Sequence, residues 1–177
     1  VATLENGTAW GLHWTEGDER DMLYFDGTRW NMVNALPWNY PETIGSFGNS
    51  AWVGGRTGRL AQLVQSIAGT WQWNAMTSPM TGNVERIIGV ASGQAVAMAS
   101  AQVAVLSGGT WTLLPASGLT QQTDMDATSI NNIVVVSTNA VGGSRIRRWN
   151  GATWSIIPEP AAQQLFGVLM VGDSIIT

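Results

Sequence analysis

Few side chains in this sequence are of the types that carry catalytic chemistry. His13 is the single histidine among 177 residues, cysteine is absent, and all eight Lys+Arg cations are arginines. Thiolate nucleophiles, disulfides, Cys-ligated metals and mechanisms that depend on a lysine amine are therefore excluded. The alternation of His13 with Trp10 and Leu12 favours a structural position along a strand. We expect a protein that is not an enzyme and that uses no cofactor.

Carboxylates cluster in two places that could hold a cation. Residues 17–21 form the densest charged segment, but they lie between two expected strands, where a solvated hairpin loop is the better interpretation. Asp124 and Asp126 alternate on one side of a strand start, without the glycine and the later glutamate of a calcium loop. The sequence therefore predicts no metal site.

The glycine-rich segment 54–58 is similar in composition to loops that bind phosphate through backbone amides. A strand pattern over residues 59–64 follows it, whereas those phosphate sites depend on the N-terminus of a helix. The segment is therefore expected to be a hairpin turn.

Composition restricts the classes of partner and the cellular location. A formal net charge of -4 leaves no basic surface for phosphate backbones, so nucleic acid is not an expected partner. No apolar run reaches the roughly 18 residues of a membrane span, so membrane insertion is not expected either. A weakly charged surface with ten Trp and 21 Gly is typical of secreted, virion or cell-surface β-proteins. We expect an extracellular, virion or cell-surface location.

A glycine turn followed by tryptophan recurs along the chain. The tryptophans are 41, 40 and 43 residues apart, and a proline-terminated run follows each of them. An aromatic residue that recurs in a repeat packs in the core more often than it binds a ligand. These recurring positions are Trp30, Trp71, Trp111 and Trp154.

A second marker, a Gly or Asn turn that opens a strand, gives the same period. Its positions are 42, 44, 38 and 42 residues apart: Trp10, Trp52, Val96, Val134 and Ile176. Two independent markers with one period of about 42 residues indicate a repeat architecture. The predicted units are approximately 1–37, 38–79, 80–115, 116–158 and a partial unit at 159–177.

Each unit contains four short runs rich in Val, Ile, Thr and Trp, which is the composition of β-strands. The runs are 43–47, 50–54, 59–65 and 70–73 in the second unit, and 128–130, 133–137, 145–149 and 153–157 in the fourth. A helix over the Ala-rich residues 84–106 is the alternative, but Gly89, Gly93 and the β-branched residues oppose it. We predict an all-β β-propeller of four-stranded antiparallel blades, with about four and a quarter repeats present.

Two arrangements of the ring stay open. The chain is either a piece of a larger ring or a small ring of four or five blades with an overlapping or incomplete closing blade. In the first case, residues 165–177 present a strand edge that further blades or other subunits must cover.

The turn-Thr-Trp pattern resembles the BNR or Asp-box group of bacterial and phage propeller repeats, which includes sialidases and HCF136-like photosystem assembly factors. The tail of the Asp box is kept at Thr110-Trp111 and Thr153-Trp154, whereas Leu106 and Trp149 occupy the aspartate position, so the boxes are degenerate. The resemblance implies a propeller in which these boxes lock turns. A sialidase would need an arginine triad, and nothing in the placement of the arginines singles one out.

Blade topology predicts where binding occurs. Connections from the second to the third strand, and from one blade to the next, share one face, and long loops on a rigid scaffold are common binding sites. Trp149 is a further tryptophan outside the recurring set and is also a candidate. The predicted ligand-binding residues are Trp14, Trp38, Tyr40 and Arg56.

We therefore predict a non-enzymatic binding or assembly module that recognises a protein or a glycan through its long-loop face. A carbohydrate-binding lectin and a sialidase-type glycoside hydrolase are the two alternatives. A lectin is expected to repeat its ligand residues from blade to blade, whereas the loops of this sequence differ.

Overall fold

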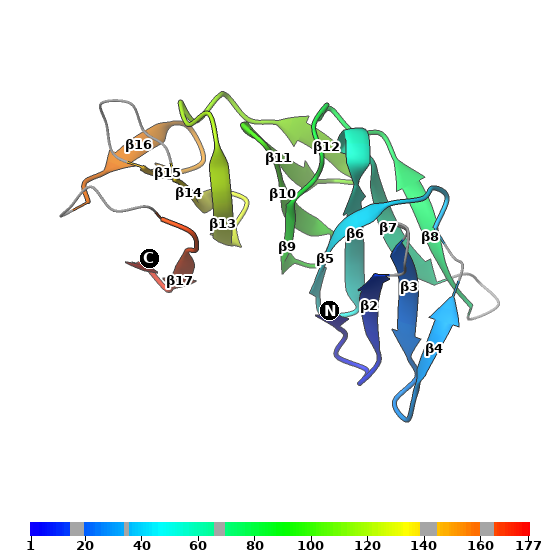
Figure 1. Cartoon of the computed structure of the whole chain (residues 1–177). Helices are drawn as coiled ribbons and strands as arrows, with labels where there is room; N and C mark the ends of the chain where they lie inside the picture. Colours follow the sequence, from blue (N-terminus) through cyan, green and yellow to red (C-terminus); the bar gives the residue numbers. More distant parts are fainter. Residues whose placement is uncertain (15–19, 34–35, 66–69, 139–144, 160–164) are drawn as a thin grey trace.

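The computed structural model describes residues 1–14, 20–33, 36–65, 70–138, 145–159 and 165–177, and it consists almost entirely of β-strands (Figure 1). Among these residues the single helical element is the 3-10 turn η1, Arg56–Gly58. Three strands lie in residues 86–107, so the alternative helix over residues 84–106 does not form. No helix in the described ranges has the length and apolar character needed to cross a membrane. The predicted all-β class is confirmed.

Four antiparallel sheets of four strands follow one another, each with its strands in chain order, and a two-stranded sheet comes last. We call these sheets blades 1 to 5. Blade 1 is β1 (Ala2–Thr3), β2 (Ala9–Trp14), β3 (Arg20–Phe25) and β4 (Trp30–Val33); blade 2 is β5 (Pro41–Phe47), β6 (Ser50–Gly55), β7 (Leu60–Gln65) and β8 (Trp71–Met76). Blade 3 is β9 (Arg86–Ala91), β10 (Gln94–Ala99), β11 (Gln102–Ser107) and β12 (Thr110–Leu113). Blade 4 is β13 (Gln122–Ser129), β14 (Asn132–Ser137), β15 (Ile146–Trp149) and β16 (Trp154–Ile157), and blade 5 is β17 (Leu169–Val171) and β18 (Ser174–Ile176).

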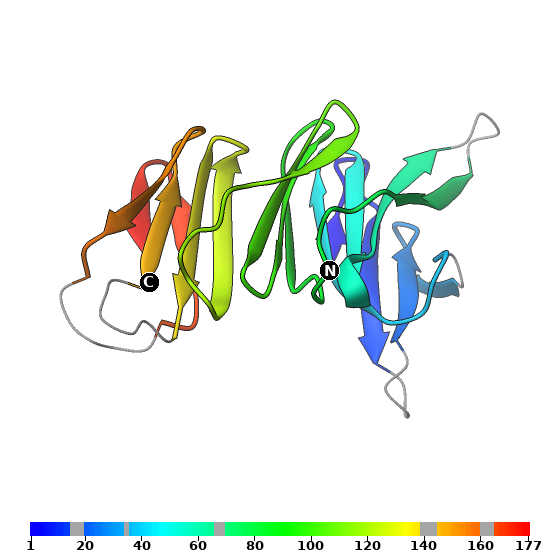
Figure 2. The same cartoon turned by 90° about the horizontal axis from the view of Figure 1, so that it is seen from above.

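The blades stand face to face in a curved row, with blade 1 at one end and blade 5 at the other (Figure 2). The first strand of each blade contacts the first strand of the next, from β1 through β5, β9 and β13 to β17. These contacts place the first strands where neighbouring blades approach each other. Radially packed sheets of this kind are the arrangement that the repeat predicts.

Two glycines allow the first strands of blades 2 and 3 to touch through their backbones. A Cβ atom at Gly45 would collide with the carbonyl group of Ile87, and one at Gly89 would lie 2.6 Å from the carbonyl carbon of Ser46. Ser46 also donates a hydrogen bond of 2.8 Å from its hydroxyl to the carbonyl oxygen of Thr3 in β1. Small side chains on the first strands therefore bring three blades together.

Successive blades bury apolar side chains against each other. We call the face of a blade toward the following blade its forward face, and the other its rear face. Trp10 on the forward face of blade 1 packs edge-on against Trp73 on the rear face of blade 2, with ring centroids 5.3 Å apart. Trp52 and Trp111 occupy one cluster between blades 2 and 3. This burial of apolar surface drives the stacking of the blades.

Cross-strand register identifies the tryptophan that repeats on the rear faces. Trp30 pairs with Phe25, and Trp111 and Trp154 hold the same place in their blades, opposite Leu106 and Trp149. In blade 2 this place belongs to Trp73, which pairs with Leu63, whereas Trp71 pairs with Gln65. The assignment of Trp71 to the recurring set was wrong, because the β7–β8 hairpin is longer than the corresponding hairpins.

Two further expectations about blade 4 need correction. Its first strand, predicted at residues 128–130, begins at Gln122, because polar side chains in this strand bond to the neighbouring blade instead of facing solvent. Trp149 was a candidate binding aromatic, but it is buried in the cluster between blades 3 and 4. Its ring lies 5.5 Å from that of Trp154, so it serves packing.

Candidate functional site

The two ends of the strands differ in their connections. Turns from the first to the second strand are tight and carry glycines with positive φ, such as Gly48 and Gly93. The opposite end carries the connections between blades and the turn from β6 to β7, and we call it the long-loop face. The structure thus has the division into two faces that the topology predicts.

Trp14, one of the predicted site residues, is the last residue of β2, where its backbone pairs with Arg20. Its side chain lies outside the described residues, as does most of the charged segment 17–21. The prediction that Trp14 binds a ligand is therefore untested. His13 is exposed on β2 opposite Asp21, in agreement with its predicted position along a strand.

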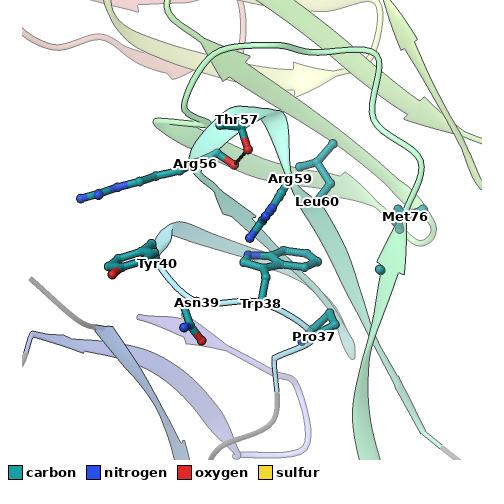
Figure 3. A pocket seen from close by; sticks show the side chains of 10 residues that line it. Pro37, Trp38, Asn39, Tyr40, Arg56, Thr57, Arg59, Leu60 and Met76 are labelled. Atoms are coloured by element: carbon teal, nitrogen blue, oxygen red, sulfur yellow. Dashed lines mark hydrogen bonds between the residues drawn. The ribbon is translucent and has the colours of Figure 1, made fainter.

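The other three predicted residues, Trp38, Tyr40 and Arg56, line one pocket of about 730 Å³ (Figure 3). Three segments build it: the connection from β4 to β5, the turn between β6 and β7, and parts of β7 and β8. Figure 3 shows the connecting segment on one wall and the η1 turn on the facing wall. The full lining is Pro37, Trp38, Asn39, Tyr40, Arg56, Thr57, Arg59, Leu60, Ala75 and Met76.

Arg56 is held in place by two neighbours. Its Nε donates a hydrogen bond of 2.9 Å to Oε1 of Glu42, whose side chain is largely buried. Its guanidinium carbon lies 4.7 Å from the ring centroid of Tyr40, which is a cation–π distance. Arg56 therefore fixes the Tyr40 ring against the wall, and Glu42 balances its charge.

The pocket is locally cationic in a protein of net negative charge. Arg56 and Arg59 both line it, and none of the described lining residues is Asp or Glu. Arg59 is exposed and forms no ion pair within the described ranges. An aromatic wall beside an exposed guanidinium suits a ligand with both an apolar part and a hydrogen-bond acceptor.

Backbone strain is concentrated at this pocket. Tyr40 and Thr57 have φ values of 64° and 58°, a region that non-glycine residues seldom adopt. Such conformations cost about 1–3 kcal/mol each and occur preferentially at functional sites. The hydroxyl of Thr57 donates a 2.7 Å bond to the carbonyl of Arg56, and its amide donates to Oδ1 of Asn83 at 3.3 Å. Contacts with the next connection thus hold the strained turn.

The indole of Trp38 packs against Gly55, where a larger residue would collide with it. A Cβ atom at Gly55 would lie 2.7 Å from Nε1 of Trp38 and 3.1 Å from the carbonyl oxygen of Tyr40. Gly55 itself closes the η1 turn, since its amide bonds to the carbonyl of Arg59 at 2.9 Å. Gly55 therefore closes the η1 turn and also leaves room for the indole of Trp38.

The glycine-rich segment 54–58 is a hairpin connection between β6 and β7, as predicted. A Cβ atom at Gly54 would lie 2.5 Å from Cγ1 of Val84, and one at Gly58 would collide with the carbonyl of Met80. These glycines allow close packing against the connection between blades 2 and 3. Their packing role accounts for the composition that is similar to a phosphate loop.

Asp124 and Asp126 lie on the forward face of β13. Their Oδ2 atoms accept hydrogen bonds from the amides of Val168 at 3.0 Å and Met170 at 2.7 Å. Arg86 of blade 3 also reaches Oδ1 of Asp124 at 3.4 Å. These carboxylates therefore connect three blades.

Sequence reasoning missed several lining residues, among them Arg59 and Met76. Arg59 follows the η1 turn directly, so its proximity to Arg56 was a usable signal. Met76 ends β8, and only the packing of β8 beside β7 brings it to the pocket.

The chain matches no family model and no curated protein. Similar solved structures include YCF48 from Cyanidioschyzon merolae, with a TM-score of 0.58 and 14% identity, covering 92% of this chain and 63% of that chain. A structure described as YCF48 bound to D1 peptide has a TM-score of 0.62 and 14% identity, covering 99% of this chain and 65% of that one. The extracellular domain of BT4673 from B. thetaiotaomicron has a TM-score of 0.61 and 12% identity, covering 90% of this chain and 24% of that chain.

These relatives are β-propeller proteins, and at such low identity the likeness shows the fold. The chain therefore has the propeller arrangement of four-stranded blades, and the similarity to the HCF136-like group holds at the level of fold. It spans less than two thirds of the length of the YCF48 structures.

Proposed function

We propose that this chain is a non-enzymatic propeller module that binds a protein partner, with the pocket around Trp38, Tyr40 and Arg56 as the binding site. The observation that carries the proposal is the convergence of an aromatic wall, exposed Arg59 and two strained residues on one cavity of the long-loop face. Large aromatic and arginine side chains dominate the affinity of protein interfaces.

A protein ligand is favoured over a glycan for two reasons. The solved YCF48 structure with a D1 peptide is an example of this fold holding a peptide. The loops also differ among the blades, whereas a lectin built from repeats is expected to present similar pockets. Glycan binding by Trp38 and Tyr40 is the alternative, because aromatic rings stack on sugars.

The absence of catalysis is part of the proposal. A glycosidase requires two carboxylates facing one sugar ring, and the described pocket lining has none. The nearest carboxylate, Glu42, is paired with Arg56. We further propose an extracellular, virion or cell-surface location, to which the likeness to an extracellular domain lends support.

Selection of peptides from a random display library on the immobilised chain tests the proposal. Binding constants of the selected peptides are then measured with the wild type and with Trp38→Ala, Tyr40→Ala and Arg59→Ala. We expect each substitution to weaken binding about tenfold or more, which corresponds to about 1.4 kcal/mol. Arg59→Ala changes an exposed side chain, so it separates a binding defect from a folding defect.

Phe47→Ala is the matched control, because Phe47 is an exposed aromatic at the opposite end of β5. Selected peptides that bind all four variants as tightly as the wild type would contradict the pocket assignment. A glycan array that yields binding lost in Trp38→Ala, in place of any peptide, would favour the lectin alternative. Hydrolysis of a fluorogenic sialoside that is lost in Tyr40→Phe would overturn the non-enzymatic assignment.

A further inference from the structure

The outermost strand of blade 2 has an unpaired edge. β8 pairs with β7 on one side and lies on the outer side of the blade (Figure 1). It has six residues, whereas β4, β12 and β16, which hold the same place in blades 1, 3 and 4, have four each. Within the described ranges, no residue bonds to the backbone of β8 from the outer side. β8 is therefore the longest open edge among these fourth strands.

The sequence of β8 does not protect this edge against another strand. Charged side chains, prolines and bulges are the usual means of protection. Residues Trp71–Met76 include no charged side chain and no proline, and their register with β7 is continuous. Blade 2 has blades 1 and 3 on its two faces, and propeller blades join a ring through their faces. The outer edge of β8 therefore does not depend on where the ring closes.

Two pockets meet at the C-terminal end of β8, where Ala75 and Met76 line both. The pocket of Trp38 and Tyr40 lies toward the connection from blade 1 (Figure 3). A second pocket of about 510 Å³ lies toward blade 3, between residues 75–79 and the start of β12. Its full lining is Ala75, Met76, Thr77, Ser78, Pro79, Gly109, Thr110 and Trp111. The free edge of β8 thus runs into a pocket on each side of the blade.

The second pocket lies where the next interface is closed by a hydrogen bond. Nε1 of Trp154 donates a bond of 2.7 Å to the carbonyl oxygen of Pro115, in the connection after β12. Trp111 holds the same place in blade 3, but its Nε1 is buried and has no hydrogen-bond partner within the described residues. The connection after β8 therefore does not close on Trp111, and the pocket opens between them.

The two pockets differ in chemistry. Arg56 and Arg59 make the first cationic beside its aromatic wall. None of the described residues that line the second is charged: Met76, Pro79 and Trp111 give it apolar surface, and Thr77, Ser78 and Thr110 add hydroxyl groups. The first pocket suits a side chain with an apolar part and an acceptor oxygen, and the second suits an uncharged, mainly apolar side chain.

We propose that the peptide partner binds in an extended conformation, as a fifth strand on the outer edge of β8, with one side chain in each pocket. This mode of binding rests on the function proposed above and specifies it further. Only an extended chain can pair its backbone with a strand edge, and side-chain pockets then give the specificity. Successive side chains of a strand point to opposite faces, so the two anchor residues are separated by an odd number of positions.

N-methylation of the tightest-binding peptide from the library selection tests the strand pairing. Each amide of the peptide is methylated in turn, and the binding constant is measured with the wild-type chain. Alternate amides of an added strand point to its partner, so methylation at every second position should weaken binding about tenfold or more. Methylation at the positions between them should leave binding within about twofold. A series without this alternation would overturn the proposal.

Thr110→Glu tests the second pocket, because it places a charge at an exposed position of an uncharged lining. We expect it to weaken peptide binding about tenfold or more. Thr153→Glu is the matched control, since Thr153 is the exposed residue before the repeating tryptophan of blade 4. It should bind as the wild type does, and circular dichroism should show the same β-sheet spectrum for both variants.

The outcomes separate this mode of binding from the proposed function itself. Peptides that lose affinity for Trp38→Ala and Arg59→Ala but bind Thr110→Glu as tightly as the wild type would overturn the two-pocket strand and leave the peptide-binding function standing. Equal losses in Thr110→Glu and Thr153→Glu would also overturn the two-pocket strand. A selection that yields no peptide would overturn both.

Discussion

The carboxylate of Asp126 in blade 4 accepts a hydrogen bond of 2.7 Å from the backbone amide of Met170 in blade 5. Met170 is the buried residue of β17. The Asp126 side chain of blade 4 therefore accepts a hydrogen bond that the carbonyl group of a neighbouring strand would accept within a sheet. Asp124 does the same for Val168 at 3.0 Å. Polar side chains of the first strand thus join blades 4 and 5, whereas glycines of the first strands allow blades 2 and 3 to touch.

We expect Asp126→Ala to destabilise the packing of blade 5. The substitution leaves a buried amide without its acceptor, which costs about 1–3 kcal/mol. Hydrogen exchange at Met170 should accelerate accordingly, while amides in β6 and β10 keep their protection. Asp126→Asn retains an acceptor oxygen and should lose less. Unchanged exchange at Met170 in Asp126→Ala would show that the bond does not hold the strand.

Gly45→Ala should destabilise the whole protein. The added methyl group would collide with the backbone carbonyl of Ile87, which moves only if blades 2 and 3 separate. We expect a loss of about 1–3 kcal/mol or more in the free energy of unfolding, measured by urea denaturation. Gly82→Ala is the matched control, because its nearest neighbours would lie 3.6 Å or more away. Equal effects of the two substitutions would contradict the close approach of the strands.

Gly55→Ala should displace the Trp38 indole from the wall of the pocket. Its Cβ atom would displace the indole of Trp38, which would lie 2.7 Å away at Nε1. Peptides selected on the wild type should bind this variant about tenfold or more weakly, as with Trp38→Ala. The resonance of a fluorinated Trp38 should shift at the same time. Wild-type affinity combined with a displaced ring would remove Trp38 from the binding site.

Asp26 should make the β3–β4 turn sensitive to acid. Hydrogen bonds to its carboxylate, foremost from the Thr28 hydroxyl and then from the Arg29 and Thr28 amides and the Asn31 side chain, lower the pKa of Asp26 far below its usual value. The carboxyl group has a lower pKa folded than unfolded, so its contribution to stability is present above the unfolded pKa, near 4, and is lost as the pH falls toward the folded value.

The measurement is the urea midpoint of the wild type and of Asp26→Asn between pH 7 and pH 2. The advantage of the wild type should shrink as the pH falls below about 4. Asn150 provides an internal comparison, because it holds the equivalent turn of blade 4 through bonds to the amides of Ala152 and Thr153, without a titrating group. A difference between wild type and variant that is independent of pH would contradict the role of the carboxylate.

Much of the architecture was predictable from the spacing of tryptophans and glycines. A period of about 42 residues with four strand-like runs requires each sheet to bury its faces on its neighbours, and this gave the four-stranded blades. The same topology predicted that Trp38, Tyr40 and Arg56 lie on one face, because strand direction alternates within a blade. Local composition therefore determined the blades and the face on which the long loops lie.

Tertiary packing determined the contacts between blades and the lining of the pocket, which local composition does not specify. Trp73 holds the repeating register position in blade 2 and packs against Trp10 of blade 1, while Trp71 lies partly buried against the same cluster, because the length of the β7–β8 hairpin sets which tryptophan takes that position. Asp124 and Asp126 appear as loop-like polar residues in the sequence but bond to the amides of the next blade. The pocket exists because Gly55 admits Trp38 and because β8 brings Met76 beside η1. These contacts join residues far apart in the chain, so only the folded arrangement of the blades determines them.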